Sequence, residues 1–318
     1  MNTIAVCVIN YNTSKLLREC LHSVLAQNAE EIVVVDNASV DGSVEMMKTE
    51  FPSIPLVALE KNIGFGAASN QGIERCCSEQ IVLLNADTQM KHGSLQALCN
   101  YLADHPQAAI IGPRILNPDG TLQTSCFHFP TPLHIFLYIS GLYRSIPHLP
   151  ILKQRTLQKM TGESPKQVPW ILGAALAFRR KTFEGMGGFD ENFFMYFEEV
   201  DLCYRLSSQG KQIHFVPEAE ITHVGGGSTA QKRAWSYIQF FTSLAQFYRK
   251  HYPMPLLTEM VFTVKAVAFF KLIRDFLLLK ISRDPAQRSM LAVDFDIHRQ
   301  LLSGQWHRDP NTGTMIQA

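Results

Sequence analysis

The sequence IAVCVINYNTSKLLRECLHSVLAQNAEEIVVVD (Ile4–Asp36) determines the predicted fold. Its two ends, Ile4–Asn10 and Glu31–Asp36, are short apolar runs rich in β-branched residues, which is typical of buried strands. Ser14–Ala26, between them, has the spacing of an amphipathic helix. Its apolar face consists of Leu16, Leu17, Cys20, Leu21, Val24 and Leu25. A strand, a helix and a strand in this order predict two parallel strands joined by a helix.

The same alternation continues through the first third of the chain. We expect a helix at Gly42–Glu50, a strand at Leu56–Leu59, a helix from about Gly66 and a strand at Gln80–Asn85. The prediction is therefore an α/β fold with a mostly parallel, twisted sheet flanked by helices. Polar residues follow the predicted strands, and ligands bind at that edge of open α/β sheets. These residues are Asn10, Tyr11, Asn12, Asp36, Asn37, Asn62, Asn85 and Asp87.

The later part of the chain is more varied. Gly112–Gln123 predicts a β-excursion with a tight turn at Asp119-Gly120, and Val168–Arg179 and Gln212–Val216 predict further strands. Phe127–Leu152 is rich in aromatic residues, Pro and Leu, and it fits either ordinary core or a loop that exposes apolar surface. From Ala230 onwards the pattern is helical, and Pro253 and Pro255 divide it.

Composition excludes several classes of protein. The 318 residues carry a formal net charge of +1, which argues against nucleic-acid binding. The seven cysteines are odd in number and show no disulfide or metal spacing, so we expect reduced thiols in a cytoplasmic protein. No signal-peptide pattern opens the chain, and six charged residues interrupt the apolar segment 253–281, so we expect no membrane-spanning helix.

The segment MGGFDENFFMYFEEVDLCYR (Met186–Arg205) gathers three carboxylates into one turn of a predicted helix. Asp201 has the spacing to pair with Arg205 four residues later, which favours a structural role. Glu198 and Glu199 repel one another, and a fold rarely places two such groups together for stability alone. A carboxylate can take a proton from a hydroxyl group, so this pair predicts a catalytic site.

Two further clusters carry weaker signals. LLNADT (Leu83–Thr88) places Asn85 and Asp87 after a buried strand, where a carboxylate can bind Mg²⁺ or Mn²⁺. His223 follows another strand, and a lone histidine is more often a structural residue than a metal ligand. No sequence fits the phosphate-binding loop GxxxxGK[ST] or the dinucleotide fingerprint GxGxxG.

Seven motifs in order resemble a known family. They are VINYNTSKLLRECLHSV, VVVDNASVDGS, NIGFGAASNQG, LLNADT, WILGAALAFRR, GGFDENFFMYFEEVDLCYR and HVGGGST. Together they resemble the inverting glycosyltransferases of family 2, which have the GT-A fold, and in particular their bacterial rhamnosyltransferase-like branch. The resemblance covers roughly residues 3–230.

The resemblance implies an NDP-sugar donor, a divalent cation (Mg²⁺ or Mn²⁺) and a role for each matching residue. Asp87 would bind the metal, and His223 matches the late metal-ligand histidine of the family. Glu199 matches the general base, although most relatives have Asp there, so Glu198 and Glu199 both remain candidates. The other donor-side residues implied are Asn10, Tyr11, Asp36, Asn62, Gly64, Asn70, Asn85, Ala86 and Gly173. Those implied on the acceptor side are Trp170, Gly188, Phe189 and Asp190.

The predicted function is inverting transfer of a sugar to a hydroxyl group, with dTDP-L-rhamnose as the favoured donor and UDP- or GDP-linked sugars as alternatives. The resemblance implies a lipid-linked or growing cell-surface glycan as the acceptor. A sugar-nucleotidyltransferase would need a loop rich in Gly and Arg where this chain has Asn10–Thr13. A non-catalytic glycan-binding module would not need Asp87, Glu199 and His223 together.

The predicted domains are a GT-A domain at residues 1–230, with halves at about 1–112 and 113–230, and a helical extension at 231–318. Residues 265–288 hold six basic and two acidic side chains among apolar ones, a pattern of helices that lie on an anionic membrane surface. The same pattern fits a helix that packs on its own domain or on a second subunit of a homodimer. We favour peripheral contact with the inner face of the cell membrane.

Overall fold

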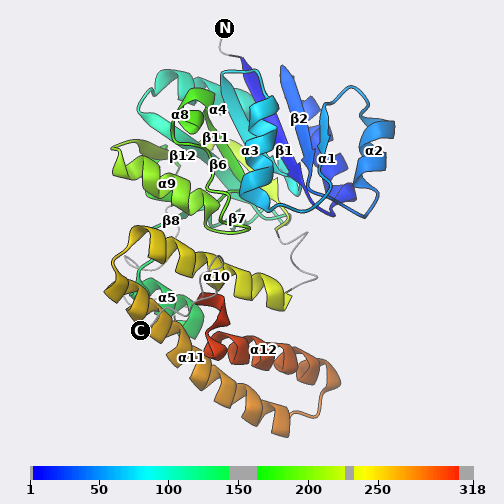
Figure 1. Cartoon of the computed structure of the whole chain (residues 1–318). Helices are drawn as coiled ribbons and strands as arrows, with labels where there is room; N and C mark the ends of the chain where they lie inside the picture. Colours follow the sequence, from blue (N-terminus) through cyan, green and yellow to red (C-terminus); the bar gives the residue numbers. More distant parts are fainter. Residues whose placement is uncertain (1–2, 143–162, 226–232, 308–318) are drawn as a thin grey trace. The chain divides into compact units, whose positions relative to one another are not determined.

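The computed structural model describes residues 3–142, 163–225 and 233–307 (Figure 1). The chain divides into two compact units. The sheet unit consists of Met1–Phe129, Gln158–Phe194 and Glu198–Ala230, and the helical unit consists of Pro130–Leu157, Met195–Phe197 and Gln231–Ala318. Of the described residues, 130–142 and 195–197 cluster with the C-terminal helices in the helical unit.

The main sheet of the sheet unit is mixed and mostly parallel. Its strand order is β3-β2-β1-β4-β11-β6-β12-β5, with β7 beside β6 and β9 beside β12. Strands β3, β2, β1 and β4 are parallel, β11 is antiparallel to β4 and β6, and β12 is parallel to β6. A second, two-stranded sheet pairs β8 with β10. The strands are β1 (Ile4–Asn10), β2 (Glu31–Asp36), β3 (Leu56–Ala58), β4 (Gln80–Asn85), β5 (Thr88–Met90), β6 (Ala108–Leu116), β7 (Leu122–Gln123), β8 (Cys126–Phe127), β9 (Lys166–Val168), β10 (Trp170–Ile171), β11 (Ala175–Arg179) and β12 (Gln212–His223).

Helices cover both faces of this sheet, as Figure 1 shows for α1 and α3. Alternate residues of β1 face two different hydrophobic cores, because successive side chains of a strand point to opposite faces. Val6 and Val8 pack in a core with α1, α2 and α4, whereas Ala5 and Cys7 pack in a core with α3, α8 and α9. The helices are α1 (Ser14–Leu25), α2 (Ser43–Glu50), α3 (Phe65–Arg75), α4 (Ser94–Asp104), α8 (Arg180–Gly185) and α9 (Glu198–Ser208).

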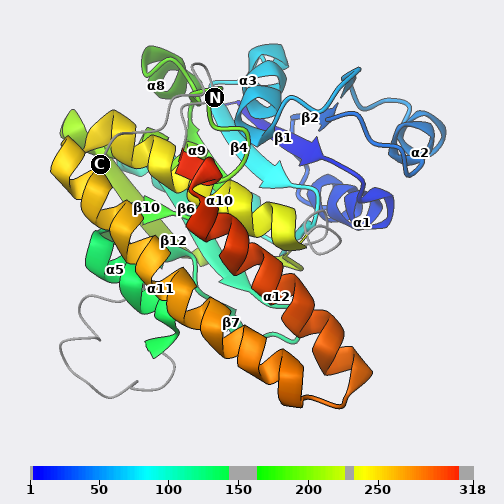
Figure 2. The ribbon, with the colours of Figure 1, turned by 60° about the horizontal axis from the view of Figure 1, so that its bottom comes forward.

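The helical unit confirms the expected helical tail and its division at Pro253. Pro253 immediately precedes α11, and the Asp284 side chain caps α12 by accepting a hydrogen bond from the Ala286 amide at 3.0 Å. Figure 2 shows α11 and α12 side by side as a helical hairpin, and the two helices are in contact. The elements are α5 (Pro132–Ser140), α10 (Arg233–His251), α11 (Met254–Ile281), α12 (Pro285–Ser303) and the short 3₁₀ helix η2 (Gln305–His307).

The described part of the aromatic segment 127–152 contains both buried core residues and exposed apolar residues. It contributes Phe127 to β8 and continues into α5. Ile135 and Ile139 of α5 are buried, whereas Leu133 and Phe136 are exposed. Residues 143–152 lie outside the described residues. Within the described ranges, no helix is long and apolar enough to cross a membrane.

Candidate active site

Polar side chains end three neighbouring strands at one edge of the main sheet. Asn10 ends β1, Asp36 ends β2 and Asn85 ends β4. Asn10 lies opposite Asp36 in the register of β1 with β2, and Ile9 lies opposite Asn85 in the register of β1 with β4. The parallel strands therefore bring the three predicted site residues together at their carboxyl ends, where open α/β sheets bind ligands.

Asn10 and Asp36 form a buried pair rather than two exposed ligand contacts. The Asn10 Nδ2 atom donates to Asp36 Oδ2 at 2.7 Å and to Ser39 Oγ at 3.1 Å, and Thr13 Oγ1 donates to Asn10 Oδ1 at 2.7 Å. The other Asp36 oxygen accepts from the Ser39 amide at 2.8 Å. This pair fixes the turn after β2, while Tyr11 beside it stays half-buried. Sequence analysis did not single out Ser39, although Asp followed three residues later by Ser is a common turn pattern.

The loop before α3 is tied to both the β2 end and the segment before α9. Asn37 Nδ2 donates to Asn62 Oδ1 and to the Gly64 carbonyl, each at 3.1 Å. The Phe65 amide donates to the Phe194 carbonyl at 2.9 Å. Gly64 has φ +90°, and a Cβ atom there would lie 2.3 Å from the Phe194 oxygen. Only glycine fits at this crossing, so Gly64 and Asn62 shape the loop at this edge of the sheet.

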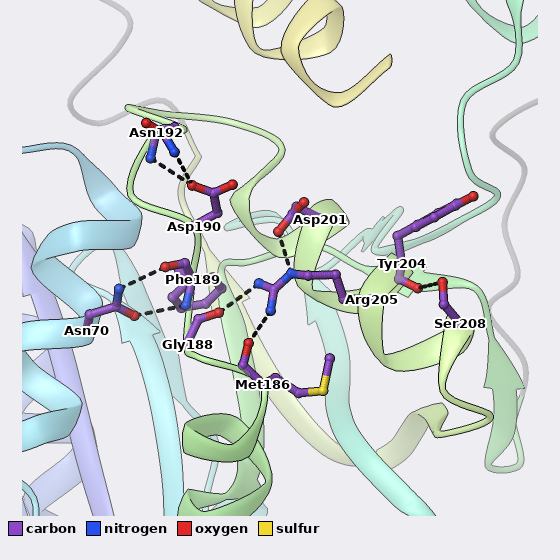
Figure 3. A network of polar contacts seen from close by, with 10 residues as sticks. All are labelled: Asn70, Met186, Gly188, Phe189, Asp190, Asn192, Asp201, Tyr204, Arg205 and Ser208. Carbon is purple, nitrogen blue, oxygen red and sulfur yellow. Dashed lines mark hydrogen bonds and ion pairs between the residues drawn. The ribbon is translucent and has the colours of Figure 1, made fainter. Parts of the chain in front are cut away.

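Asn70 clamps α3 to the glycine turn that precedes α9, as Figure 3 shows. Its Oδ1 atom accepts from the Phe189 amide at 3.0 Å, and its Nδ2 atom donates to the Phe189 carbonyl at 2.9 Å and to Glu191 Oε1 at 3.0 Å. Gly188 has φ +69°, and a Cβ atom there would approach Asn70 Oδ1 to 2.7 Å. The Asn70 amide group is thus fully engaged in holding the turn.

Arg205 holds the same turn from the other side (Figure 3). It donates to Asp201 Oδ2 at 2.7 Å, to the Met186 carbonyl at 2.6 Å and to the Gly188 carbonyl at 2.7 Å. Asp201 is fully buried, so the predicted pairing of Asp201 with Arg205 is present in the structure and anchors the first turn of α9. The other two acids of this turn, Glu198 and Glu199, stand just before Asp201 at the start of α9.

Glu198 and Glu199 begin α9 and are both buried, with exposed fractions of 5% and 8%. Glu198 packs against Gly66 of α3, and its Oε2 atom has no hydrogen-bond partner among the described residues. Burial, together with the adjacent charge of Glu199, raises the pKa of Glu198 well above its ordinary value. Glu199 packs against Gly173, whose amide donates to Glu199 Oε1 at 3.4 Å. The two acids therefore occupy different environments.

The end of β4 connects to this acid pair through the backbone. The Asn85 amide donates to the Ala174 carbonyl at 3.0 Å, and Ala174 directly follows the Gly173 that contacts Glu199. The Ala86 amide donates to the Ile9 carbonyl at 3.0 Å, which fixes the chain just before Asp87. Asn85 Oδ1 is buried and has no hydrogen-bond partner within the described part of the chain. An unsatisfied acceptor of this kind fits a group that awaits a ligand donor.

Asp87 and His223 come together although 135 residues separate them in the sequence. Asp87 Oδ1 lies 3.3 Å from His223 Nε2, and the Val224 amide donates to the Asp87 carbonyl at 3.0 Å. His223 Nδ1 lies 2.7 Å from Gln123 Oε1, and Gln123 Nε2 donates to Asn117 Oδ1 at 2.8 Å. Because the Gln123 amide donates elsewhere through its nitrogen, its oxygen accepts, and the proton of a neutral His223 sits on Nδ1. Sequence analysis missed Gln123, for which no motif gave a signal.

This arrangement turns the lone pair of His223 Nε2 towards Asp87 Oδ1. A carboxylate oxygen and an imidazole nitrogen that face one another are the donor set that Mn²⁺ and other divalent cations accept. The hydrogen bond from His223 Nδ1 to Gln123 is the kind of outer contact that orients a metal-binding histidine. Within the described ranges, no group of three or more His, Cys, Asp or Glu side chains gathers to hold a metal.

The predicted acceptor-side residues lie in two places. Trp170 is half-buried, donates from Nε1 to the His128 carbonyl at 2.9 Å and stacks on Phe127 with ring centroids 4.5 Å apart. Phe189 is 1% exposed and packs in the core beside α3 and α9. Asp190, on the same turn, accepts from the Asn192 amide at 3.0 Å and from its side chain at 2.8 Å.

Comparisons with known proteins show which family this chain resembles. A model of a family described as glycosyl transferase family 2 matches residues 5–165. An N-acetylglucosaminyl-diphospho-decaprenol L-rhamnosyltransferase of Mycobacterium tuberculosis is 28% identical over 248 residues, which cover 73% of this chain and 80% of the relative.

Two solved structures share the fold. The mannosyltransferase PcManGT from Pyrobaculum calidifontis, in complex with GDP-Man and Mn²⁺, superimposes with a TM-score of 0.52 at 17% identity, over 94% of this chain and 83% of that chain. A structure of GalNAc-T7 with UDP, GalNAc and Mn²⁺ gives a TM-score of 0.56 at 15% identity, over 95% of this chain and 56% of that chain. The expected GT-A fold is confirmed.

Proposed function

The chain belongs to glycosyl transferase family 2, and we propose that it is an inverting enzyme that transfers L-rhamnose from dTDP-L-rhamnose to a hydroxyl group of a lipid-linked or growing cell-surface glycan. The mycobacterial relative, which is named for L-rhamnosyl transfer to a diphospho-decaprenol glycolipid and matches across most of both chains, supports this donor and acceptor. UDP- and GDP-linked sugars are the alternative donors for the same site.

The observation that carries the proposal is the pair formed by Asp87 and His223, whose facing oxygen and nitrogen lie 3.3 Å apart. With the His223 proton held at Nδ1 by Gln123, both facing atoms offer lone pairs. A divalent cation can accept both of these lone pairs. A site with only two protein ligands also suits Mg²⁺ or Mn²⁺, which usually share coordination with substrate phosphates.

Asp87 and His223 would hold the divalent cation of this enzyme. When bound, the cation supplies Lewis-acid stabilisation of the negative charge on the departing nucleoside diphosphate. Of these two residues only Asp87 is an acid. The negatively charged diphosphate of the donor would therefore balance the rest of the charge of the divalent cation. The metal-bearing complexes of the two solved structures with the same fold support the assignment.

The nucleotide end of the donor is proposed to lie over the adjoining ends of β1 and β2. The buried Asn10 and Asp36 pair holds the turn there, and half-buried Tyr11 is the side chain best placed to contact the base. Asn62 and Gly64 form the neighbouring loop wall. Asn85, whose buried Oδ1 has no hydrogen-bond partner among the described residues, suits a hydroxyl donor such as the ribose.

Glu199 is the proposed general base. A base must be ionised before it can take a proton, and the raised pKa of Glu198 makes that carboxyl the harder of the two to justify as the base. The Gly173 amide donates to Glu199 Oε1 at 3.4 Å, which holds this oxygen beside the backbone that leads to Asn85. The acceptor hydroxyl, deprotonated by Glu199, attacks the anomeric carbon from the face opposite the diphosphate, so the configuration inverts.

A thermal-shift panel of NDP-sugars tests the proposal. With Mn²⁺ present, we expect dTDP-L-rhamnose to raise the melting temperature of the full chain more than UDP- or GDP-sugars do, and chelation with EDTA should remove the shift. The Gln123→Leu variant gives a comparison. It should weaken the metal-dependent rise in melting temperature, although Gln123 is not proposed to contact the donor. A larger shift with another NDP-sugar would replace the proposed donor, and no shift with any of them would reject the function.

A further inference from the structure

Helix α11 is apolar on two opposite faces, and the described residues cover only one of them. Val264, Val267 and Ala268 are buried, and the helix contacts α5, α10 and α12. Positions 262, 269, 273, 276 and 280 differ by seven, four, three and four residues, so they lie along a second stripe of the same helix. The exposed large apolar side chains of α11 are Met254, Phe262, Phe269, Phe270, Ile273, Phe276, Leu277 and Ile281.

The apolar side chains on this stripe and directly beside it are large and exposed. Phe262 on the stripe is 72% exposed, and Phe270 and Ile281 beside it are 71% and 72% exposed. Single exposed apolar residues are ordinary on protein surfaces, but a continuous row of phenylalanine and isoleucine over several helical turns marks an interaction surface. Among the described residues of the helical unit, α5, α10 and α12 pack against α11 and leave these side chains exposed.

The charge around the stripe is mostly basic. Between residues 259 and 284 the sequence has five basic side chains and three acids, Glu259, Asp275 and Asp284, and the two outer acids are exposed at the ends of this segment. Asp275 is fully buried, where it accepts from Arg274 at 2.6 Å and lies 2.7 Å from His298 Nδ1, so it presents no negative charge to the exposed stripe. Lys280 lies over the Phe276 ring, 4.4 Å from its centroid, and Arg283 is exposed just beyond the helix end.

We propose that the exposed face of α11 binds the surface of an anionic lipid bilayer, with its phenylalanines among the acyl chains and its basic side chains at the headgroups. A helix with apolar side chains on one face and flanking lysine and arginine lies in the interface of such a membrane without spanning it. Long basic side chains can keep their apolar stems beside the ring of a residue such as Phe276 while their charges reach the headgroups.

A second copy of the chain fits this surface less well. A two-fold interface pairs residue i of one copy with residue j of the other, so the exposed cations of α11 could pair only with Glu259, the one exposed acid of this helix. The exposed Arg274 and Lys280 already outnumber that acid. A bilayer with anionic headgroups supplies the missing opposite charge. This inference uses only the helical unit and does not depend on the donor or the acceptor of the transferase.

Vesicle flotation of the full chain tests the proposal. We expect the protein to float with vesicles of phosphatidylcholine and phosphatidylglycerol, and far less with phosphatidylcholine alone. Phe270→Gln combined with Phe276→Gln should lower partition by at least about tenfold, because two exposed aromatic side chains no longer enter the bilayer. Lys280→Gln combined with Arg283→Gln should lower binding to the anionic vesicles by about 25-fold, at about fivefold for each charge.

Val40→Gln is the matched control, since Val40 is 90% exposed but lies in the sheet unit. It should float like the wild-type chain, and circular dichroism should show the same helix content for all variants. The proposal is overturned if the wild-type chain stays at the bottom of both gradients, or if the charge variant floats as well as the wild type. It is also overturned if sedimentation velocity shows a dimer that the Phe270 and Phe276 changes dissociate while flotation is unaffected.

Discussion

Replacing Glu198 with glutamine should stabilise the protein in a manner that depends on pH. Glu198 is 5% exposed, and burial with the charge of Glu199 raises its pKa well above 4.5 in the folded state. The folded protein therefore binds a proton here that the unfolded chain has released, so wild-type stability falls as pH rises above the ordinary carboxyl pKa. Glutamine keeps the shape of the neutral acid and removes this dependence.

The size of the effect follows from the same linkage. Each pH unit between 4.5 and the raised folded pKa costs the wild type up to about 1.4 kcal/mol relative to the glutamine variant. The buried Oε2 position has no hydrogen-bond partner among the described residues, and an unsatisfied amide there would cost a constant of about 1–3 kcal/mol at every pH. The growth of the difference with pH, rather than its absolute value, is thus the diagnostic quantity.

Urea unfolding of both proteins at a series of pH values from 4 to about 8 measures this difference. Glu74→Gln is the matched control, because Glu74 is exposed on α3 and its replacement should leave the pH dependence of stability unchanged. A difference between Glu198→Gln and wild type that stays flat across the series, or that shrinks as pH rises, would refute the argument that Glu198 is held protonated.

Three further predictions concern the loop and the metal pair. Gly64→Ala should lower the free energy of unfolding by about 2–4 kcal/mol in denaturant melts, because φ is +90° and the new Cβ would meet the Phe194 oxygen; an unchanged melt would show that the crossing can open. Asp87→Ala should weaken Mn²⁺-dependent donor affinity at least about a hundredfold by calorimetry, and full activity in EDTA would remove the metal role of this residue. Gln123→Leu should weaken Mn²⁺ binding about 10–100-fold by freeing the His223 ring, and an unchanged affinity would show that the tautomer is set otherwise.

Much of the nucleotide-binding half could be predicted from local pattern. Strands Ile4–Asn10, Glu31–Asp36 and Gln80–Asn85 have the predicted bounds, because each is a short apolar run that ends in a polar residue at the sheet edge. The later half is less regular. The predicted strand at Val168–Arg179 is three short strands in two sheets, since Pro169 separates the first from the second and residues 172–174 separate the second from the third. Periodicity carries no information about such a change of sheet.

In the candidate site, too, contacts between residues close in sequence could be predicted, whereas contacts between distant segments could not. The pairing of Asp201 with Arg205 follows from helix spacing, and the structure has it. The roles of Asn70 and Gln123 could not be read from the sequence, because each depends on a segment about a hundred residues away: Asn70 on Phe189, and Gln123 on His223. Helix α4 was not assigned from the sequence, although its buried leucines have helical spacing.

The assignment of proton transfer to Glu199 is the central claim of this account, and single-turnover sugar transfer tests it most directly. With saturating donor and Mn²⁺, Glu199→Gln should slow transfer by about 10²–10⁴-fold while donor affinity stays unchanged, because the variant keeps the shape of the side chain and loses the proton acceptor. Glu198→Gln, which leaves the proposed base in place, should stay within about tenfold of the wild-type rate. The account is contradicted if Glu199→Gln transfers sugar at a near-normal rate while Glu198→Gln does not.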